Sequence, residues 1–199
     1  MKSFGTAIIL AGGQSSRMGF DKQFLKIDEK KLMDSIISKL ETKFEEIIIV
    51  TNKPEEYKDL NHKIISDIIV GKGPLGGIHA GLNESSSKYS FVMACDMPNI
   101  NINYINYMES CIEGKDIDGC VTMYRDNLEP FISFYSKDII EDIEKYLELG
   151  RRSIHKLLRS LQIHYIAEEI ARKFSPDWHM FLNLNTIEDL SLYTTTKSK

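Results

Sequence analysis

Short apolar runs alternate with amphipathic segments along the first half of the chain. The runs Thr6–Leu10, Ile47–Val50 and Tyr89–Cys95 are continuously apolar, which is typical of strands that are buried on both faces. Between them, Leu32–Leu40 and Asn101–Cys111 carry apolar residues at helical spacing. This alternation predicts an α/β fold, with a mostly parallel sheet that helices cover on both faces and with right-handed crossovers.

The second half is less regular, and its pattern predicts the remaining elements. The predicted strands are Gly119–Tyr124, Pro130–Tyr135 and Gln162–Ile166, and the predicted helices are Ile139–Leu147 and Ser153–Leu161. The first two strands flank a polar turn at 125–127, and the tail from Thr194 onwards is polar and expected to fray. We expect residues 1–199 to form one domain, which suits a chain of this length.

Composition and charge exclude several classes of partner. Hydrophobic residues make up 42% and charged residues 27%, as in an ordinary globular protein, and the formal net charge of −4 predicts no nucleic acid and no membrane as partner. Cys95, Cys111 and Cys120 have no metal-ligand spacing, and an odd, sparse set of cysteines is typical of a reducing compartment. Without a visible signal peptide or an apolar run of about 20 residues, we expect a cytoplasmic location.

The stretch 10–22, LAGGQSSRMGFDK, follows the first predicted strand. Gly12 and Gly13 expose backbone N–H groups, and Arg17 and Lys22 add two positive charges, so the stretch offers what a polyphosphate needs. The alternative is a plain strand-to-helix turn with solvated basic residues. The chain has neither GxxxxGK[ST] nor GxGxxG at this site, which argues against a P-loop NTPase and an ordinary dinucleotide-dependent dehydrogenase.

Polar residues follow the other predicted strands of the first half. Asn52 comes after the second strand, Asp67 after Ile64–Ile65, and Asp96 after the strand that ends at Cys95. In an open α/β sheet such strand ends converge on one rim, where ligands bind. A carboxylate at a strand tip beside a phosphate site suits Mg²⁺. The alternative for Asp96 is an Asx-turn residue that bonds its own backbone.

Two further segments carry candidate ligand contacts. The Gly-rich loop 71–77 leads into a helix start at Ile78–Leu82, and would let a flat base or a ribose lie against backbone; a flexible connector is the alternative. Near the end of the chain, Thr186 and Asp189 have the spacing of a helix cap. Asn183 and Asn185 then stay available to point a carbonyl oxygen toward a metal or a phosphate.

With these motifs in order, the chain resembles the molybdenum cofactor guanylyltransferases, within the larger group of α/β nucleotidyltransferases. The resemblance rests on LAGGQSSRMGFDK at 10–22, GPLGGIHAGL at 73–82, CDMP at 95–98 and NLNTIEDL at 183–190, with weaker echoes in LEPFISFY at 128–135 and GRRSIHKLL at 150–158. Two departures concern loop shape: Asp28–Lys31 stands where family members often carry a glycine, and Ile187 where a proline is common. The resemblance implies a three-layer, Rossmann-like nucleotidyltransferase fold.

The resemblance also implies an activity and a set of site residues. The activity is transfer of GMP from GTP to the phosphate of molybdopterin, with release of pyrophosphate. The implied catalytic residues are Arg17, Lys22 and Asp96, the last of which would ligate Mg²⁺; the implied binding residues are Leu10, Ala11, Gly12, Gly13 and Lys22 for the nucleotide backbone and phosphates, Asn52, Asp67, Gly73, Pro74, Leu75 and Gly76 for guanine and ribose, and Asn183 and Asn185 near the metal or the molybdopterin phosphate.

Other interpretations of the same residues stay open. The N-terminal half would bind the nucleotide and the C-terminal half the acceptor, where Arg151, Arg152 and Lys156 are candidate phosphate contacts or a solvated helix start. A related nucleotidyltransferase would use CTP or a sugar-phosphate acceptor, and a non-catalytic module would only bind nucleotide and deliver cofactor. Molybdopterin-synthesis proteins and molybdoenzyme chaperones are the partner proteins that the resemblance implies.

Overall fold

The computed structural model describes residues 2–12, 22–184, 189 and 193. The strands are β1 (Lys2–Leu10), β2 (Glu46–Val50), β3 (Lys63–Ile65), β4 (Ser87–Ala94), β5 (Gly119–Tyr124), β6 (Asn127–Ser136) and β7 (Ile163–Ile166). The α-helices are α1 (Lys22–Leu40), α2 (Pro74–Glu84), α3 (Ile102–Ile112), α4 (Ile140–Glu148), α5 (Ile154–Leu158) and α6 (Glu168–Ala171), and the short 3₁₀ helices are η2 (Pro54–Glu56), η3 (Lys137–Ile139) and η4 (His179–Phe181).

The strands of the described residues form one sheet in the order β3-β2-β1-β4-β6-β5-β7. β1 pairs in parallel with both β2 and β4, β2 pairs in parallel with β3, and β5 with β7. β6 is antiparallel to β4 and β5, because a tight turn at 125–126 joins it to β5 as a hairpin. The predicted α/β class and the mostly parallel sheet are confirmed.

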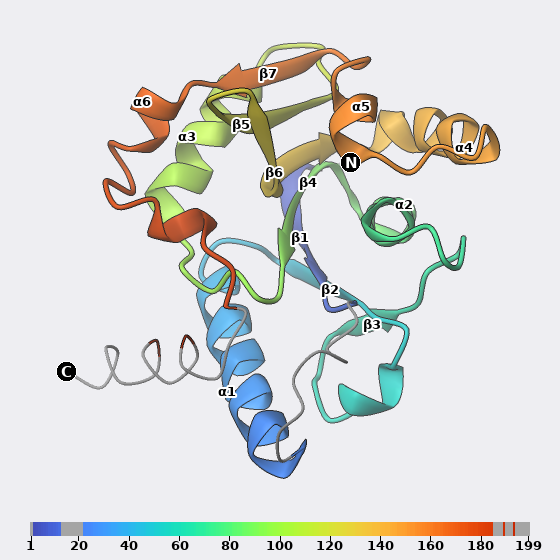
Figure 1. Ribbon diagram of the computed structural model, residues 1–199, viewed down its shortest axis with the longest axis vertical. Coiled ribbons are helices and arrows are strands. Elements are labelled where there is room, and N and C mark those ends of the chain that lie inside the picture. Colours follow the sequence, from blue (N-terminus) through green and yellow to red (C-terminus); the bar gives the residue numbers. More distant parts are fainter. Residues whose placement is uncertain (1, 13–21, 185–188, 190–192, 194–199) are drawn as a thin grey trace.

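Helices cover the sheet on both faces, which gives three layers. In Figure 1, α1 and α3 lie on one side of the strands, and α2, α4 and α5 lie on the other. Neighbouring residues of β1 point to opposite layers: Ile9 belongs to the core with Phe91 and Tyr104, and Ile8 to the core with Val92 and Tyr135. This double burial explains why the strands read as continuous apolar runs rather than as alternating ones.

The predicted helix Ser153–Leu161 is shorter in the structure, where α5 ends at Leu158. Ser153 caps its start by accepting a hydrogen bond from the N–H of Lys156. At the other end the hydroxyl of Tyr165 donates to the carbonyl of Leu158 at 3.0 Å, so a side chain from β7 satisfies a carbonyl that a longer helix would pair internally. Helix α1 begins at Lys22, ten residues before the start of the predicted helix Leu32–Leu40, whereas the other predicted helices and strands agree with the structure to within four residues.

None of the helices in the described part of the chain is both long enough and apolar enough to cross a membrane. The predicted cap formed by Thr186, and the tail from Thr194, lie outside the described residues.

Helix α2 packs closely against β1, and its position matters because its first turn borders the strand ends. A Cβ atom added at Gly81 would lie 2.5 Å from Cγ2 of Ile8, whose side chain is fully buried. On its outer side, His79 of α2 lies with Nε2 2.8 Å from Oε1 of Glu144 on α4. Close backbone approach on one side and a polar contact on the other hold α2 between β1 and α4.

We predict that Gly81→Ala destabilises the protein by about 1–3 kcal/mol, because Ile8 cannot move away within a packed core. An ordinary glycine-to-alanine change inside a helix has the opposite sign and stabilises by about 1 kcal/mol. Urea denaturation of the two proteins measures the difference. An increase in the free energy of unfolding would contradict this account of how α2 packs.

Candidate functional site at the strand ends

The carboxyl ends of four parallel strands meet at one edge of the sheet. Backbone hydrogen bonds extend the ladders past the strands: Ala11 N–H donates to Val50 (2.8 Å), and Cys95 N–H donates to Leu10 (3.1 Å). In the same way Thr51 N–H donates to the carbonyl of Ile65 at 2.8 Å. The segments that follow β1, β2, β3 and β4 therefore begin side by side, which is the convergence that the sequence predicts.

Asn52 and Asp67 form a mutual pair on the β2–β3 side of this edge. The amide of Asn52 donates to Oδ2 of Asp67 at 3.1 Å, and its carbonyl oxygen accepts from the N–H of Asp67 at 3.3 Å. The carboxylate of Asp67 also borders the first turn of α2, where a Cβ at Gly76 would lie 3.4 Å from Oδ2. The helix dipole favours a carboxylate in this position.

The Gly-rich loop adopts backbone conformations that only glycine takes readily. Gly71 and Gly73 have positive φ angles of 75° and 64°, and Gly73 directly precedes α2. Pro74 is exposed as the first helical residue, whereas Leu75 is buried in the core beneath α2. Of these predicted binding residues, Leu75 can therefore offer a ligand only its backbone. Gly77, the last residue of the predicted loop, packs closely against β1, because a Cβ there would lie 3.1 Å from Cδ2 of Leu10.

Asp96 follows β4 and carries an unsatisfied oxygen atom. Its Oδ1 is buried and has no hydrogen-bond partner among the described residues. Burial raises the pKa of its carboxyl above the usual range, although its own backbone N–H donates to the carboxylate and partly opposes that shift. A buried anionic oxygen without a donor is costly, and a bound cation is one way to satisfy it.

The C-terminal segment reaches the same place. The N–H of Leu184 donates to the carbonyl of Asp96 at 2.8 Å, which brings the exposed Asn183 beside the end of β4. Gly13, Arg17 and Asn185 lie outside the described residues, and for Lys22 the structure describes the backbone at the start of α1 but not the side chain. Leu10, Ala11 and Gly12 continue from β1 at the centre of the edge, and a Cβ at Gly12 would meet nothing within 4 Å.

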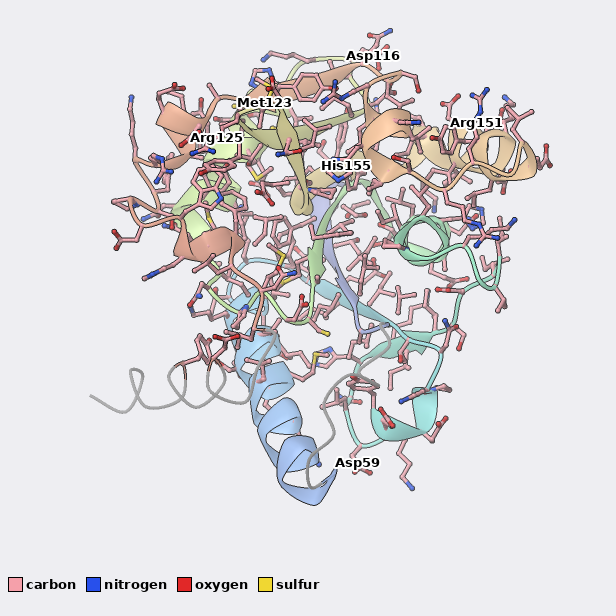
Figure 2. All side chains as sticks on the ribbon, in the orientation of Figure 1. Asp59, Asp116, Met123, Arg125, Arg151 and His155 are labelled. Carbon is pink, nitrogen blue, oxygen red and sulfur yellow. The ribbon has the colours of Figure 1, made fainter. Side chains whose placement is uncertain are left out.

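The basic cluster of the C-terminal half lies elsewhere. Figure 2 shows Arg151 at the outer end of α4, well apart from the carboxyl ends of β1 and β2. The guanidinium of Arg151 lies 5.8 Å from the ring centre of Tyr146, and Arg152 and Lys156 are exposed. The structure thus does not bring Arg151 to the strand ends.

Sequence reasoning assigned no role to Glu129 and Trp178. Glu129, at the start of β6, is half-buried, and burial raises the pKa of its carboxyl while the indole N–H of Trp178 donates to it. The ring of Trp178 lies 4.8 Å from that of Tyr124, at the end of β5. Glu129 falls in the stretch LEPFISFY, but only the three-dimensional contact with Trp178 distinguishes it from an ordinary strand residue.

The edge as a whole brings together backbone atoms and polar side chains from several loops. Backbone atoms of β1 and of the Gly-rich loop, the pair of Asn52 and Asp67, and the carboxylate of Asp96 all lie along it. Within the described residues there is no group of three or more His, Cys, Asp or Glu side chains that could hold a metal ion. A cation there would take Asp96 and complete its coordination with water and with ligand oxygens, as Mg²⁺ commonly does.

Comparisons with known proteins agree with this geometry. The family model described as the MobA-like NTP transferase domain matches residues 7–165. A probable molybdenum cofactor guanylyltransferase from Peptoclostridium acidaminophilum is 52% identical, over 97% of this chain and 90% of that protein. A molybdenum cofactor guanylyltransferase from Syntrophotalea carbinolica is 51% identical, over 94% of this chain and 89% of that protein.

Solved structures show the same architecture. The molybdopterin-guanine dinucleotide biosynthesis protein A from Archaeoglobus fulgidus has a TM-score of 0.77 and 25% identity, with 97% of this chain and 98% of that chain covered. A 4-diphosphocytidyl-2C-methyl-D-erythritol synthase from Anaerococcus prevotii has a TM-score of 0.63 at 15% identity, with 100% of this chain and 99% of that chain covered, and shares the fold alone.

We predict that Asp96→Asn stabilises the metal-free protein at neutral pH, because the amide does not have to be ionised where it is buried. The pKa of Asp96 is higher in the folded than in the unfolded protein, so folding favours the protonated acid. The free energy of unfolding of the wild type should therefore fall relative to that of Asp96→Asn as the pH rises above about 4.

Urea denaturation in the presence of a chelator measures this difference at a series of pH values. Asp126→Asn, in the exposed β5–β6 turn, controls for the loss of one negative charge. The difference in free energy of unfolding between wild type and Asp96→Asn could instead stay constant from pH 4 to neutral pH, to within the error of about 0.5 kcal/mol. That result would show that burial does not destabilise the ionised form of Asp96.

Proposed function

Because the chain belongs to the MobA-like NTP transferase family, and within it to the molybdenum cofactor guanylyltransferases, we propose that it transfers GMP from GTP to the phosphate of molybdopterin and releases pyrophosphate. The observation that carries this proposal is the half-buried Asp96 with its unsatisfied oxygen, at the edge where the loops after β1, β2 and β3 also begin. Relatives more than 50% identical over nearly the full chain supply the choice of GTP and of the acceptor.

The two substrates occupy different parts of the edge in this proposal. GTP lies over the ends of β1, β2 and β3, with guanine and ribose near Asn52, Asp67 and the loop from Gly73 to Gly76. Its phosphates lie along the stretch that contains Gly12, Gly13, Arg17 and Lys22. Molybdopterin approaches from the side of β4, β6 and the C-terminal segment, where Asn183 and Asn185 are candidate contacts for the metal or for the acceptor phosphate.

Asp96 fits a divalent cation because its Oδ1 is buried and without a donor among the described residues. We propose Mg²⁺ as that cation, and it would neutralise charge on the phosphates between which the GMP unit moves. The protein's own contribution is to hold a carboxylate in a place that is unfavourable without a cation, so that the cation and the nucleotide bind together.

The chain's residues then act by position and charge. The nucleophile is a phosphate oxygen that is already anionic, so no general base is needed. Among the described residues, the most buried histidine–carboxylate contact is that of His79 with Glu144. It joins α2 to α4 and involves no predicted site residue, so it does not supply a general base. Alignment of the acceptor phosphate with the α-phosphorus, and positive charge from Arg17 and Lys22 on the departing pyrophosphate, account for catalysis.

Other functions remain as outcomes of the test. The same fold occurs in an enzyme whose name indicates a cytidyl product, so a CTP-dependent or sugar-phosphate enzyme is the nearest alternative. A non-catalytic module that binds nucleotide and delivers cofactor is the second. Molybdopterin-synthesis proteins or molybdoenzyme chaperones are proposed as partners, and location in the cytoplasm stays a prediction from the cysteine content.

The test measures pyrophosphate release from GTP, CTP or UTP, each with and without molybdopterin and Mg²⁺. We expect release only from GTP, and only when molybdopterin and Mg²⁺ are both present. Asp96→Ala should lower the rate by about two orders of magnitude, which is typical for loss of one group that stabilises the transition state. Asp116→Ala is the matched control, because that side chain is fully exposed. Release with CTP alone would favour the cytidylyl alternative, and nucleotide binding without release would favour the delivery module.

Recognition of the base can be tested at Asp67. A carboxylate accepts both N1–H and the 2-amino group of guanine, whereas xanthine carries a 2-oxo group there. We predict that Asp67→Asn changes the ratio of kcat/KM for GTP to that for xanthosine triphosphate by about 10- to 100-fold in favour of xanthosine triphosphate, the range expected for a charged hydrogen bond. A loss of activity that is equal for both nucleotides would assign Asp67 to the ribose instead.

A further inference from the structure

Glu129 lies near the start of β6, and Asp96 lies just after the end of the neighbouring strand β4. In the antiparallel ladder of β4 and β6, Met93 faces Ile132. Past this pair, β4 leads in three residues to Asp96, and β6, followed backward, leads in three residues to Glu129. Asp96 thus follows the end of β4, and Glu129 lies near the start of β6, at the same edge of the sheet.

The C-terminal segment connects the two carboxylates. Trp178 donates its indole N–H to the carboxylate of Glu129, and Leu184 donates its backbone N–H to the backbone carbonyl of Asp96. Between them, the amide of Asn99 donates to the carbonyl of His179 at 3.1 Å, which ties the segment to the loop after β4. Residues 178–184 therefore run from one carboxylate to the other along the rim.

The carboxylate of Glu129 keeps most of its acceptor capacity. An ionised carboxylate has about four acceptor positions. Among the described residues, the indole of Trp178 is the donor that lowers the pKa of Glu129, and no Lys, Arg or His side chain forms an ion pair with it. Burial raises the pKa of Glu129, because its carboxyl is partly shielded from water. Beside it lie the rings of Trp178 and Tyr124, with the guanidinium of Arg172 5.0 Å from the ring centre of Trp178 and that of Arg125 5.1 Å from the ring centre of Tyr124.

The two substrates of the proposed reaction share one recognition element. Guanine and the pterin ring of molybdopterin both present a ring N–H and an exocyclic amino group beside a carbonyl. One carboxylate can accept from both donors. The joined product carries one such edge at each end, with the new pyrophosphate bridge between them.

The order of the strands supplies two carboxylates at suitable places. Asp67 follows β3, which is three strands from β4, whereas Glu129 belongs to β6, the next strand on the other side. At about 4.8 Å per strand, this spacing puts the start of the Asp67 loop about 14 Å from β4 on one side and the paired part of β6 about 5 Å from β4 on the other. The metal candidate Asp96 lies between them.

We propose that Glu129 binds the amino and ring N–H groups of the acceptor's pterin ring, and so determines which acceptor is used. This inference rests on the proposed function. Glu129 is a specificity residue for the second substrate in the way that Asp67 is for the first, and Trp178 holds its carboxylate in place. Each substrate has a guanine-like edge, and each edge is bound by one carboxylate: Asp67 binds the nucleotide and Glu129 binds the acceptor, on either side of Asp96.

Steady-state kinetics with Glu129→Gln separates the two substrates. The amide keeps the shape of the side chain and its acceptor for Trp178, but it turns one acceptor oxygen into a donor. We expect the KM for molybdopterin to rise by about 10- to 100-fold, as for loss of a charged hydrogen bond, while the KM for GTP stays within about twofold. Asp67→Asn should show the reverse pattern, and Glu148→Gln, an exposed residue at the end of α4, is the matched control.

The single tryptophan of the chain gives a second readout that needs no turnover. The probe is 6-carboxypterin, whose ring absorbs where tryptophan emits, and it should quench Trp178 in the wild type. 6-Carboxylumazine carries a 2-oxo group in place of the amino group. Its dissociation constant should be at least about tenfold higher than that of 6-carboxypterin. Glu129→Gln should reverse or abolish that preference, because its amide can donate to the 2-oxo group.

The outcomes separate this inference from the proposed function. If the wild type transfers GMP but Glu129→Gln leaves the KM for molybdopterin and the pterin preference unchanged, the inference is wrong and the function stands. If Glu129→Gln raises the KM for GTP instead, the carboxylate reads the nucleotide and the inference is also wrong. If the wild type binds 6-carboxypterin with the expected preference but transfers no GMP, the function is wrong while the pterin site stands.

Discussion

The parallel pairing of β1 with β2 on one side and β4 on the other is the constraint on which the site depends. It aligns the carboxyl ends of these strands, and the ladder continues past them through Ala11 and Cys95. Loops that are far apart in sequence therefore start at neighbouring points. The alignment is stable because every residue of β1 from Thr6 to Leu10 is buried between two layers of helices, so a shift of register would expose an apolar core.

The site carries costs that the rest of the fold must offset. Asp96 keeps a buried oxygen without a donor in the described part of the chain, and Arg125 and Trp178 have positive φ angles of 53° and 62°. Each such feature is unfavourable on its own, by about 1–3 kcal/mol. All three lie at or near the carboxyl end of the sheet, whereas the apolar layers on both faces are continuous. This division is typical of a stable scaffold that supports a strained binding edge.

Much of the fold could be predicted from the sequence, because double burial leaves a plain signal in the strands, as at Ile47–Val50. The same is true of Asp96, since a carboxylate directly after a buried strand is visible in the sequence. The end of α5 could not be predicted, because the carbonyl of Leu158 accepts from the N–H of Leu161 and from the hydroxyl of Tyr165 on β7, a contact that is formed only in the folded chain. Glu129 was missed for a similar reason: its burial results from contact with Trp178, which is distant in sequence.

The antiparallel direction of β6 has a consequence for how such enzymes can diverge. Because β6 runs opposite to its neighbours, it brings its first residues to the rim, and these are joined to β5 by a turn of two residues. In the proposed function, the acceptor side of the rim therefore includes one compact hairpin, whereas the nucleotide side is built from the crossover loops of the first half. A hairpin can be exchanged between related chains without disturbing those crossovers, so new acceptors can be acquired while the nucleotide is kept.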